Sequence, residues 1–113
     1  MSEAVPEVSA PDSAGFLASG AILLDVREQD EWDAGHAPDA VHLPMSELAG
    51  RAAEIPRDVA VLCVCHVGGR SSAVAAALNR AGWDAHNLTG GMAAWQAAGL
   101  PVGRPDGLPG AVG

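Results

Sequence analysis

Lysine is absent from this chain, and its only basic residues are six arginines, which face 14 acidic residues. The formal net charge of −8 repels phosphate backbones and anionic lipid headgroups. We therefore expect neither a nucleic acid nor a membrane surface among the partners of this protein. A small anionic substrate would need a local concentration of positive potential inside an otherwise negative molecule.

The sequence also lacks a long apolar run and a disulfide framework. No run approaches the roughly 20 apolar residues of a membrane span, and the acidic N-terminus has none of the features of a signal peptide. The only two cysteines, Cys63 and Cys65, are near the limit of disulfide reach if they lie on one strand. Neither they nor the histidines have the spacing of a zinc site. We expect a cytoplasmic protein that needs no metal and no organic cofactor.

Apolar residues make up 49% of the 113 residues, enough for one domain with its own core. Apolar runs typical of strands alternate with runs of helical periodicity. Strands are expected at 5–8, 21–26, 40–43, 59–64 and 85–88, and helices at 9–19, 28–34, 46–54, 71–81 and 92–98. Ser9 and Ser46 are the expected N-caps of the first and third helices.

Continuous apolar strands with short connections to helices predict an α/β fold, a three-layer sandwich with a central, mostly parallel sheet flanked by helices. This domain is expected to span residues 1–103. The remaining residues, 104–113, contain two prolines and three glycines and show no periodicity. They are predicted to form a flexible tail.

The segment from Cys65 to Ser71 joins the strongest predicted strand to an amphipathic helix. Ligands of open α/β sheets bind at the carboxyl ends of the strands, where this loop must lie. A cysteine that faces a helix N-terminus is stabilised as the thiolate, which is the nucleophilic form. Gly68 and Gly69 allow positive φ, so that successive N–H groups can point at one anion, and Arg70 adds a fixed positive charge. Cys65 is thus the predicted nucleophile, and the predicted substrate-binding residues are His66, Val67, Gly68, Gly69, Arg70 and Ser71.

Three side chains around the nucleophile have less specific predicted roles. A protonated His66 would lower the pKa of Cys65, whereas a neutral imidazole could equally face solvent. Ser71 is expected to bond a group of the loop or to cap the helix N-terminus. Cys63 lies inside the apolar strand and is expected to pack.

Upstream of this segment, charged and aromatic residues are expected to serve the structure. Arg27 and Glu31 are spaced i, i+4 and predict an ion pair. His36 and His42 flank a turn and a strand, where hydrogen bonding is the expected role. No spacing joins the histidines into a set of metal ligands.

Loop length indicates what the anion cradle holds. Cysteine phosphatases use a similar cradle with five residues between cysteine and arginine, whereas four separate Cys65 from Arg70. A tighter loop suits a single sulfur atom better than a tetrahedral phosphate. The sequence resembles single-domain rhodaneses, the thiosulfate-type sulfurtransferases, which have a loop of this length. Segments similar to the upstream and closing signatures of that family are Leu23–Glu28, Glu31–Trp32, Gly35–His36, Ala40–Pro44, Leu88–Trp95 and Gly99–Pro101.

The resemblance implies a sulfurtransferase that carries sulfane sulfur as a persulfide on Cys65. The donor would be thiosulfate or a similar small anion, and the acceptor cyanide, a low-molecular-weight thiol or a thioredoxin-like protein. Asp25 would support the site from a strand end, although a carboxylate that satisfies nearby backbone N–H groups explains it equally well. Two alternatives stay open: a non-catalytic or sulfur-relay module of the same fold and, less favoured, a cysteine phosphatase or arsenate reductase.

Overall fold

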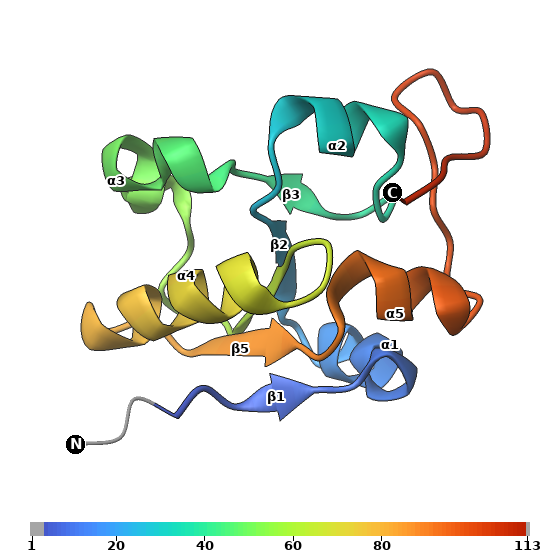
Figure 1. Cartoon of the computed structure of the whole chain (residues 1–113). Coiled ribbons are helices and arrows are strands. Elements are labelled where there is room, and N and C mark those ends of the chain that lie inside the picture. Colours follow the sequence, from blue (N-terminus) through green and yellow to red (C-terminus); the bar gives the residue numbers. More distant parts are fainter. Residues whose placement is uncertain (1–3, 113) are drawn as a thin grey trace.

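A single parallel sheet organises the chain, which a computed structural model describes from residue 4 to residue 112 (Figure 1). Its strand order is β1-β5-β4-β2-β3, and every pairing of neighbours is parallel. The strands are β1 (Glu7–Val8), β2 (Ile22–Asp25), β3 (Val41–His42), β4 (Val61–Val64) and β5 (Ala85–Leu88). The strand that precedes Cys65, β4, is the central one, so its carboxyl end is flanked on both sides by other strands.

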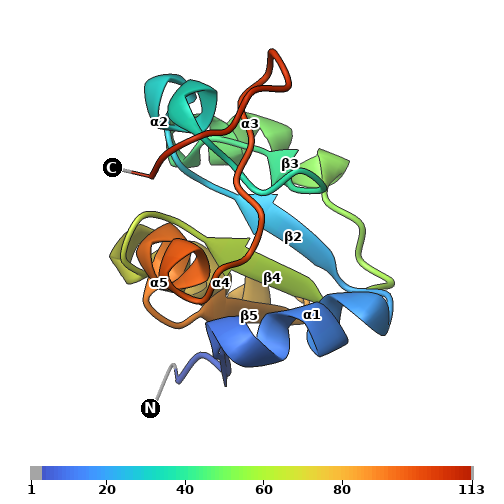
Figure 2. The same ribbon diagram turned by 90° about the vertical axis from the view of Figure 1, so that its right-hand side faces the viewer.

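Helices cover both faces of the sheet, which confirms the predicted three-layer sandwich (Figure 2). On one face lie α4 (Gly69–Arg80) and α3 (Leu48–Arg51), and on the other α1 (Ala10–Ala18) and α5 (Gly91–Ala97). The short helix α2 (Gln29–Ala34) follows the carboxyl end of β2.

Side chains of the central strand alternate between the two hydrophobic clusters because successive residues of a strand point to opposite faces. Val61 and Cys63 pack with Leu78 of α4, together with Cys65, which follows the strand. Leu62 and Val64 pack in the other cluster, with the residues of α1 and α5. The two cysteines therefore share the α4 face of the sheet.

The predicted order of strands and helices is confirmed, with one local correction between residues 45 and 54. In place of one helix, this segment forms two 3-10 turns, η1 (Met45–Glu47) and η2 (Ala52–Glu54), on either side of the single turn α3. Ser9 caps α1 as predicted, but Ser46 caps nothing, because its hydroxyl donates to Glu28 Oε1 at 2.8 Å. Gly50 in the middle of the segment disfavours a continuous helix.

Of the segment predicted to be a flexible tail, residues 110 and 111 lie against the C-terminal end of α2. Gly103 and His36 exchange two backbone hydrogen bonds of 2.9 Å, and the N–H of Ala111 donates to Ala34 O at 3.0 Å. Gly35 makes room for this return, since a Cβ there would lie 2.6 Å from Ala111 O. Residues 110–112 thus pack on the domain, whereas residues 104–109 are exposed, and the flexibility of the segment stays a prediction. No helix between residues 4 and 112 has the length and apolar character needed to cross a membrane.

Candidate active site around Cys65

Cys65 is the first residue after β4, at the carboxyl edge of the sheet, and α4 begins only four residues later. The predicted helix at 71–81 therefore starts two residues earlier than expected, at Gly69. This short connection makes the chain turn back over Cys65, so that the sulfur faces the N-terminus of a 12-residue helix. The unpaired N–H groups and the positive end of the helix dipole both favour negative charge at that point.

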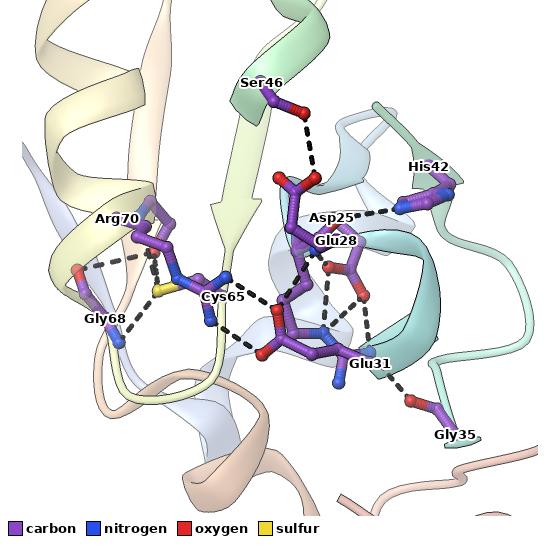
Figure 3. Close-up of polar contacts among 11 residues, drawn as sticks. Asp25, Glu28, Glu31, Gly35, His42, Ser46, Cys65, Gly68 and Arg70 are labelled. Carbon is purple, nitrogen blue, oxygen red and sulfur yellow. Dashed lines mark hydrogen bonds and ion pairs between the residues drawn. The ribbon is translucent and has the colours of Figure 1, made fainter. Parts of the chain in front are cut away.

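Three hydrogen bonds converge on the Cys65 sulfur (Figure 3). The backbone N–H of Gly68 donates at 3.2 Å, and the backbone N–H and the hydroxyl of Ser71 both lie at 3.3 Å. Burial is the largest influence on the pKa of Cys65 and raises it. Hydrogen bonds from Ser71, Gly68 and the Arg70 backbone outweigh burial and lower the pKa below the ordinary thiol value. The site therefore stabilises a thiolate.

Of the two glycines in the loop, only Gly68 uses the conformation that glycine allows. Its φ of +109° places it in the left-handed region as the N-cap of α4, and this turn aims its own N–H at Cys65 Sγ. Gly69 is simply the first residue of the helix and has no positive φ. The expectation that both glycines adopt positive φ is corrected at Gly69, because helical φ is negative.

The N-terminus of α5 supports the loop from the other side. The N–H of Met92 donates to Cys65 O at 2.7 Å, and the N–H of Ala93 donates to His66 O at 3.0 Å. Gly91, with φ +61°, packs so closely that a Cβ on it would collide with both carbonyl oxygens. The Gly90–Gly91 pair thus lets α5 hold the backbone of the nucleophile by two hydrogen bonds.

Behind Ser71 lies a polar network that the sequence did not predict. The Ser71 hydroxyl is 2.6 Å from Asn87 Oδ1 as well as 3.3 Å from Cys65 Sγ, and its single proton can serve only one of them at a time. Asn87 is 4% exposed, and its Nδ2 donates to Gly68 O at 3.3 Å and to both Glu7 carboxylate oxygens at 3.2 Å. Glu7 also accepts from the Thr89 hydroxyl at 2.9 Å. These contacts tie the edge strand β1 to the nucleophile, and no local pattern could reveal a contact between residues 80 positions apart.

Arg70, predicted to add a fixed positive charge to the loop, is paired with a carboxylate of the protein. Its Nη1 and Nη2 donate to Glu31 Oε1 and Oε2 at 2.7 and 2.8 Å, so that α4 and α2 are joined by a two-pronged ion pair (Figure 3). Hydrogen bonds from Arg70 hold the pKa of Glu31 down at about 2, and those same bonds raise the pKa of Arg70.

The predicted ion pair between Arg27 and Glu31 is therefore wrong. Arg27 instead donates hydrogen bonds from Nε and Nη2 to the carboxylate of Asp25, the shortest of them from Nη2 at 2.8 Å. Its Nη2 also donates to Gly35 O at 2.7 Å. Asp25 Oδ1 also accepts from the Arg27 backbone N–H at 3.0 Å. Both side chains are buried, and a buried carboxylate is stable only with such a partner.

Asp25 lies at the same sheet edge as Cys65, since it pairs in register with Val64. Its carboxylate, however, makes its hydrogen bonds to Arg27 and none to the Cys65 loop. The structure thus places Asp25 as an anchor of the turn after β2. Any effect of Asp25 on Cys65 would be indirect.

His66 and Val67 lie on the outer side of the loop. Val67 is 66% exposed. The half-buried imidazole of His66 lines a small cavity of about 280 Å³ with Arg27, Asp30, Glu31 and Ala34. The structure, which describes residues 4–112, shows no hydrogen bond between this imidazole and the Cys65 sulfur.

The remaining histidines that the sequence singled out have structural partners, as predicted. His36 Nδ1 is 2.9 Å from Trp32 O, and His42 Nε2 is 2.7 Å from Arg27 O. Both rings stack on Trp32, at centroid distances of 3.6 and 4.5 Å. Among the residues that the structure describes, no group of three or more histidine, cysteine or acidic side chains is arranged to hold a metal ion.

Comparison with known proteins places this geometry in a family. A family model for the rhodanese-like domain matches residues 9–98. A sulfurtransferase of Allochromatium vinosum is 40% identical over 87 residues, which cover 76% of this chain and 81% of that protein. The thiosulfate sulfurtransferase GlpE of Pseudomonas savastanoi pv. phaseolicola is 35% identical over 89 residues, covering 77% of this chain and 84% of that protein. A crystal structure of a rhodanese-related protein from Thermoplasma volcanium is 29% identical and superposes with a TM-score of 0.81, covering 86% of this chain and 96% of that one.

Proposed function

The chain belongs to the rhodanese-like domain family, and we propose that it moves sulfane sulfur from a small donor to a nucleophilic acceptor through a persulfide on Cys65. Thiosulfate or a similar compound serves as the donor. The acceptor is cyanide in an assay, or a thiol in the cell, either a low-molecular-weight thiol or a thioredoxin-like protein.

One observation carries this proposal: the Cys65 sulfur accepts hydrogen bonds from Gly68 and Ser71 at the N-terminus of α4, in a loop of four residues closed by Arg70. Donors aimed at one sulfur atom stabilise a thiolate before the reaction. The same donors can stabilise the terminal sulfur of a persulfide afterwards, as an oxyanion hole stabilises a developing charge.

The first half-reaction loads the enzyme. The Cys65 thiolate attacks the outer sulfur of the donor, and a new sulfur–sulfur bond forms while the bond inside the donor breaks. With thiosulfate the bonding electron pair leaves on sulfite, so that neither a proton nor an external oxidant is consumed. The N–H groups of the loop then hold the persulfide anion.

The second half-reaction unloads it. The acceptor nucleophile attacks the terminal sulfur, and the Cys65 thiolate leaves. A thiol with a lowered pKa leaves faster, so the hydrogen bonds that activate Cys65 also assist its release. A reducing compartment such as the cytoplasm keeps this thiol available, and the cytoplasmic location remains a prediction.

Mass spectrometry after thiosulfate treatment tests the proposal. We expect Cys65 to gain the mass of one sulfur atom, to lose it on reduction, and to release thiocyanate when cyanide is added. Reduction matters because a sulfinic acid has nearly the same added mass but resists ordinary thiol reductants. Cys65→Ser should neither load nor turn over while keeping the fold, and Cys63→Ser should still load. Transfer that persists in Cys65→Ser would refute the assignment.

The same samples separate the alternatives. Steady turnover of an aryl phosphate in a Cys65-dependent manner would replace sulfur transfer by phosphatase chemistry. A persulfide that forms on Cys65 but passes to no small acceptor would indicate a sulfur-relay module that needs a partner protein.

A further inference from the structure

The two arginine side chains in this part of the molecule are already paired with carboxylates of the protein. Arg70, which closes the loop, donates hydrogen bonds from Nη1 and Nη2 to the two carboxylate oxygens of Glu31, at 2.7 and 2.8 Å. Arg27 is buried and bound to Asp25 and to Gly35 O. A guanidinium in a two-pronged pair with a carboxylate has its charge balanced and its geometry fixed.

Further carboxylates crowd this part of the molecule. Asp30 and Glu31 line the cavity of about 280 Å³ that His66 and Arg27 also line, and Glu28 is close enough to raise the pKa of Arg70. Figure 3 shows Glu28 and Glu31 projecting from the start of α2, with Arg70 reaching across from α4. The guanidinium groups of Arg27 and Arg70 thus have four carboxylates around them, those of Asp25, Glu28, Asp30 and Glu31. This part of the molecule therefore carries more negative than positive side chains, as the whole chain does.

We propose that Glu31 is a specificity-determining residue, which, by holding Arg70, makes the site discriminate against dianionic sulfur donors in favour of donors with a single negative charge or none. This inference rests on the proposed sulfur transfer. The favoured chemical class comprises organic thiosulfonates and persulfides, in which an organic group replaces a charged oxygen or the whole sulfonate. The chemical step is unchanged: the sulfane sulfur bonds to Cys65, and the electron pair leaves on a sulfinate or a thiolate in place of sulfite.

Thiosulfate and methanethiosulfonate form a matched pair of probes, because both present an outer sulfur on a sulfonyl centre and they differ by one charge. Their leaving groups differ in intrinsic reactivity, so the informative quantity is how a substitution changes the ratio of kcat/KM for the two donors. Glu31→Gln removes one charge yet keeps a side chain that can serve the capping box of α2, where Glu31 Oε1 accepts from the Glu28 N–H at 3.1 Å. We expect this substitution to shift the ratio about five-fold toward thiosulfate, mainly through KM.

Two further variants make the test specific. Glu54→Gln removes the same charge and breaks the exposed pair of Glu54 with Arg51 at 2.9 Å, away from the Cys65 loop, so we expect an unchanged ratio. Asp30→Asn removes an exposed charge from the wall of the same cavity without touching the Arg70 pair. It should shift the ratio in the same direction as Glu31→Gln by a smaller factor, and it remains informative if Glu31→Gln does not fold.

The outcomes separate this inference from the proposed function. If both donors load Cys65 and a folded Glu31→Gln leaves the ratio unchanged, the role of Glu31 is refuted while sulfur transfer stands. If Glu31→Gln does not fold, an unchanged ratio in Asp30→Asn refutes it in the same way. An equal shift in Glu54→Gln would also refute it, since the general field of the protein would then explain the effect. If neither donor loads Cys65 in any variant, the proposed function itself fails.

Discussion

Cys63 and Cys65 lie on the same face of the sheet, two residues apart, and their exposed fractions are 0% and 1%. Their chemistry is nevertheless opposite. At both, burial is the largest influence and raises the pKa. At Cys63 burial, aided by the nearby Cys65, raises the pKa to about 12. At Cys65 the hydrogen bonds from Ser71, Gly68 and Arg70 reverse the effect.

The difference lies in the backbone around each sulfur. Cys63 lies inside β4, where the backbone groups pair with β2 and β5 and the side chain packs in the hydrophobic cluster on the α4 face. Cys65 is the first residue after the strand. The chain then turns at Gly68, and this turn brings the N–H groups at the start of α4 to the Cys65 sulfur. In this chain the direction in which the pKa of each thiol moves therefore depends on where the strand ends, and burial alone does not predict it.

The largest expected effect is the contrast in reactivity between the two thiols. In the folded protein, iodoacetamide should modify Cys65 at least about a thousand-fold faster than Cys63, because the thiolate is the reacting form and Cys63 has a pKa of about 12. The rate of Cys65 should rise with pH and then stay level, and its half-maximal pH should lie below that of an ordinary exposed thiol. The measurement is the alkylation rate of each cysteine, obtained by peptide mapping of the native protein and of the variants Cys63→Ala and Cys65→Ser. Labelling of Cys63 at a comparable rate would remove the contrast.

A smaller effect isolates one hydrogen bond. Ser71→Ala deletes the hydroxyl 3.3 Å from Cys65 Sγ, so the pKa of Cys65 should rise and the pH profile of alkylation should move to higher pH. A hydrogen bond to a charged group contributes about 1.5–3 kcal/mol, so the rate at neutral pH should fall about ten-fold or more. Ser71→Thr, which keeps a hydroxyl, should restore much of the rate.

The neighbouring Ser72 offers a matched control for this substitution, since it lies one residue further along α4, and the hydrogen bonds to the sulfur come from Gly68 and Ser71. Ser72→Ala should leave the pH profile in place. If the profile of Ser71→Ala coincides with that of the native protein, the backbone N–H groups alone distinguish Cys65 from Cys63.

The smallest expected effect concerns the field that a donor crosses to reach Cys65. With a net charge of −8 and Arg70 bound to Glu31, added salt should screen repulsion and lower the KM for thiosulfate about two-fold between low and physiological ionic strength. Steady-state kinetics in sodium chloride series provide the measurement. A KM that rises steeply with salt would show instead that attraction by the loop dominates over the field of the protein.

Local sequence patterns predicted much of this protein. The apolar run of β4 followed by glycines and a helical period located Cys65 and its loop, because strand and helix periodicity depend on near neighbours in the chain. The same reasoning failed for residues 45–54, where Gly50 and a contact between Ser46 and Glu28 outweigh helical propensity. It also assigned Glu31 to Arg27 by i, i+4 spacing, although Arg70, 39 residues away, is its partner.

The sequence by itself determined that the chain folds as a parallel α/β sandwich and that Cys65 lies at the carboxyl end of a buried strand before a helix. Only the tertiary structure decided which charges cancel and which groups support the sulfur, namely Glu31 against Arg70, and Glu7 and Asn87 behind Ser71. The physical reason is distance along the chain. Such contacts depend on strand order and register across the sheet, which bring residues 80 positions apart together and which no local period encodes.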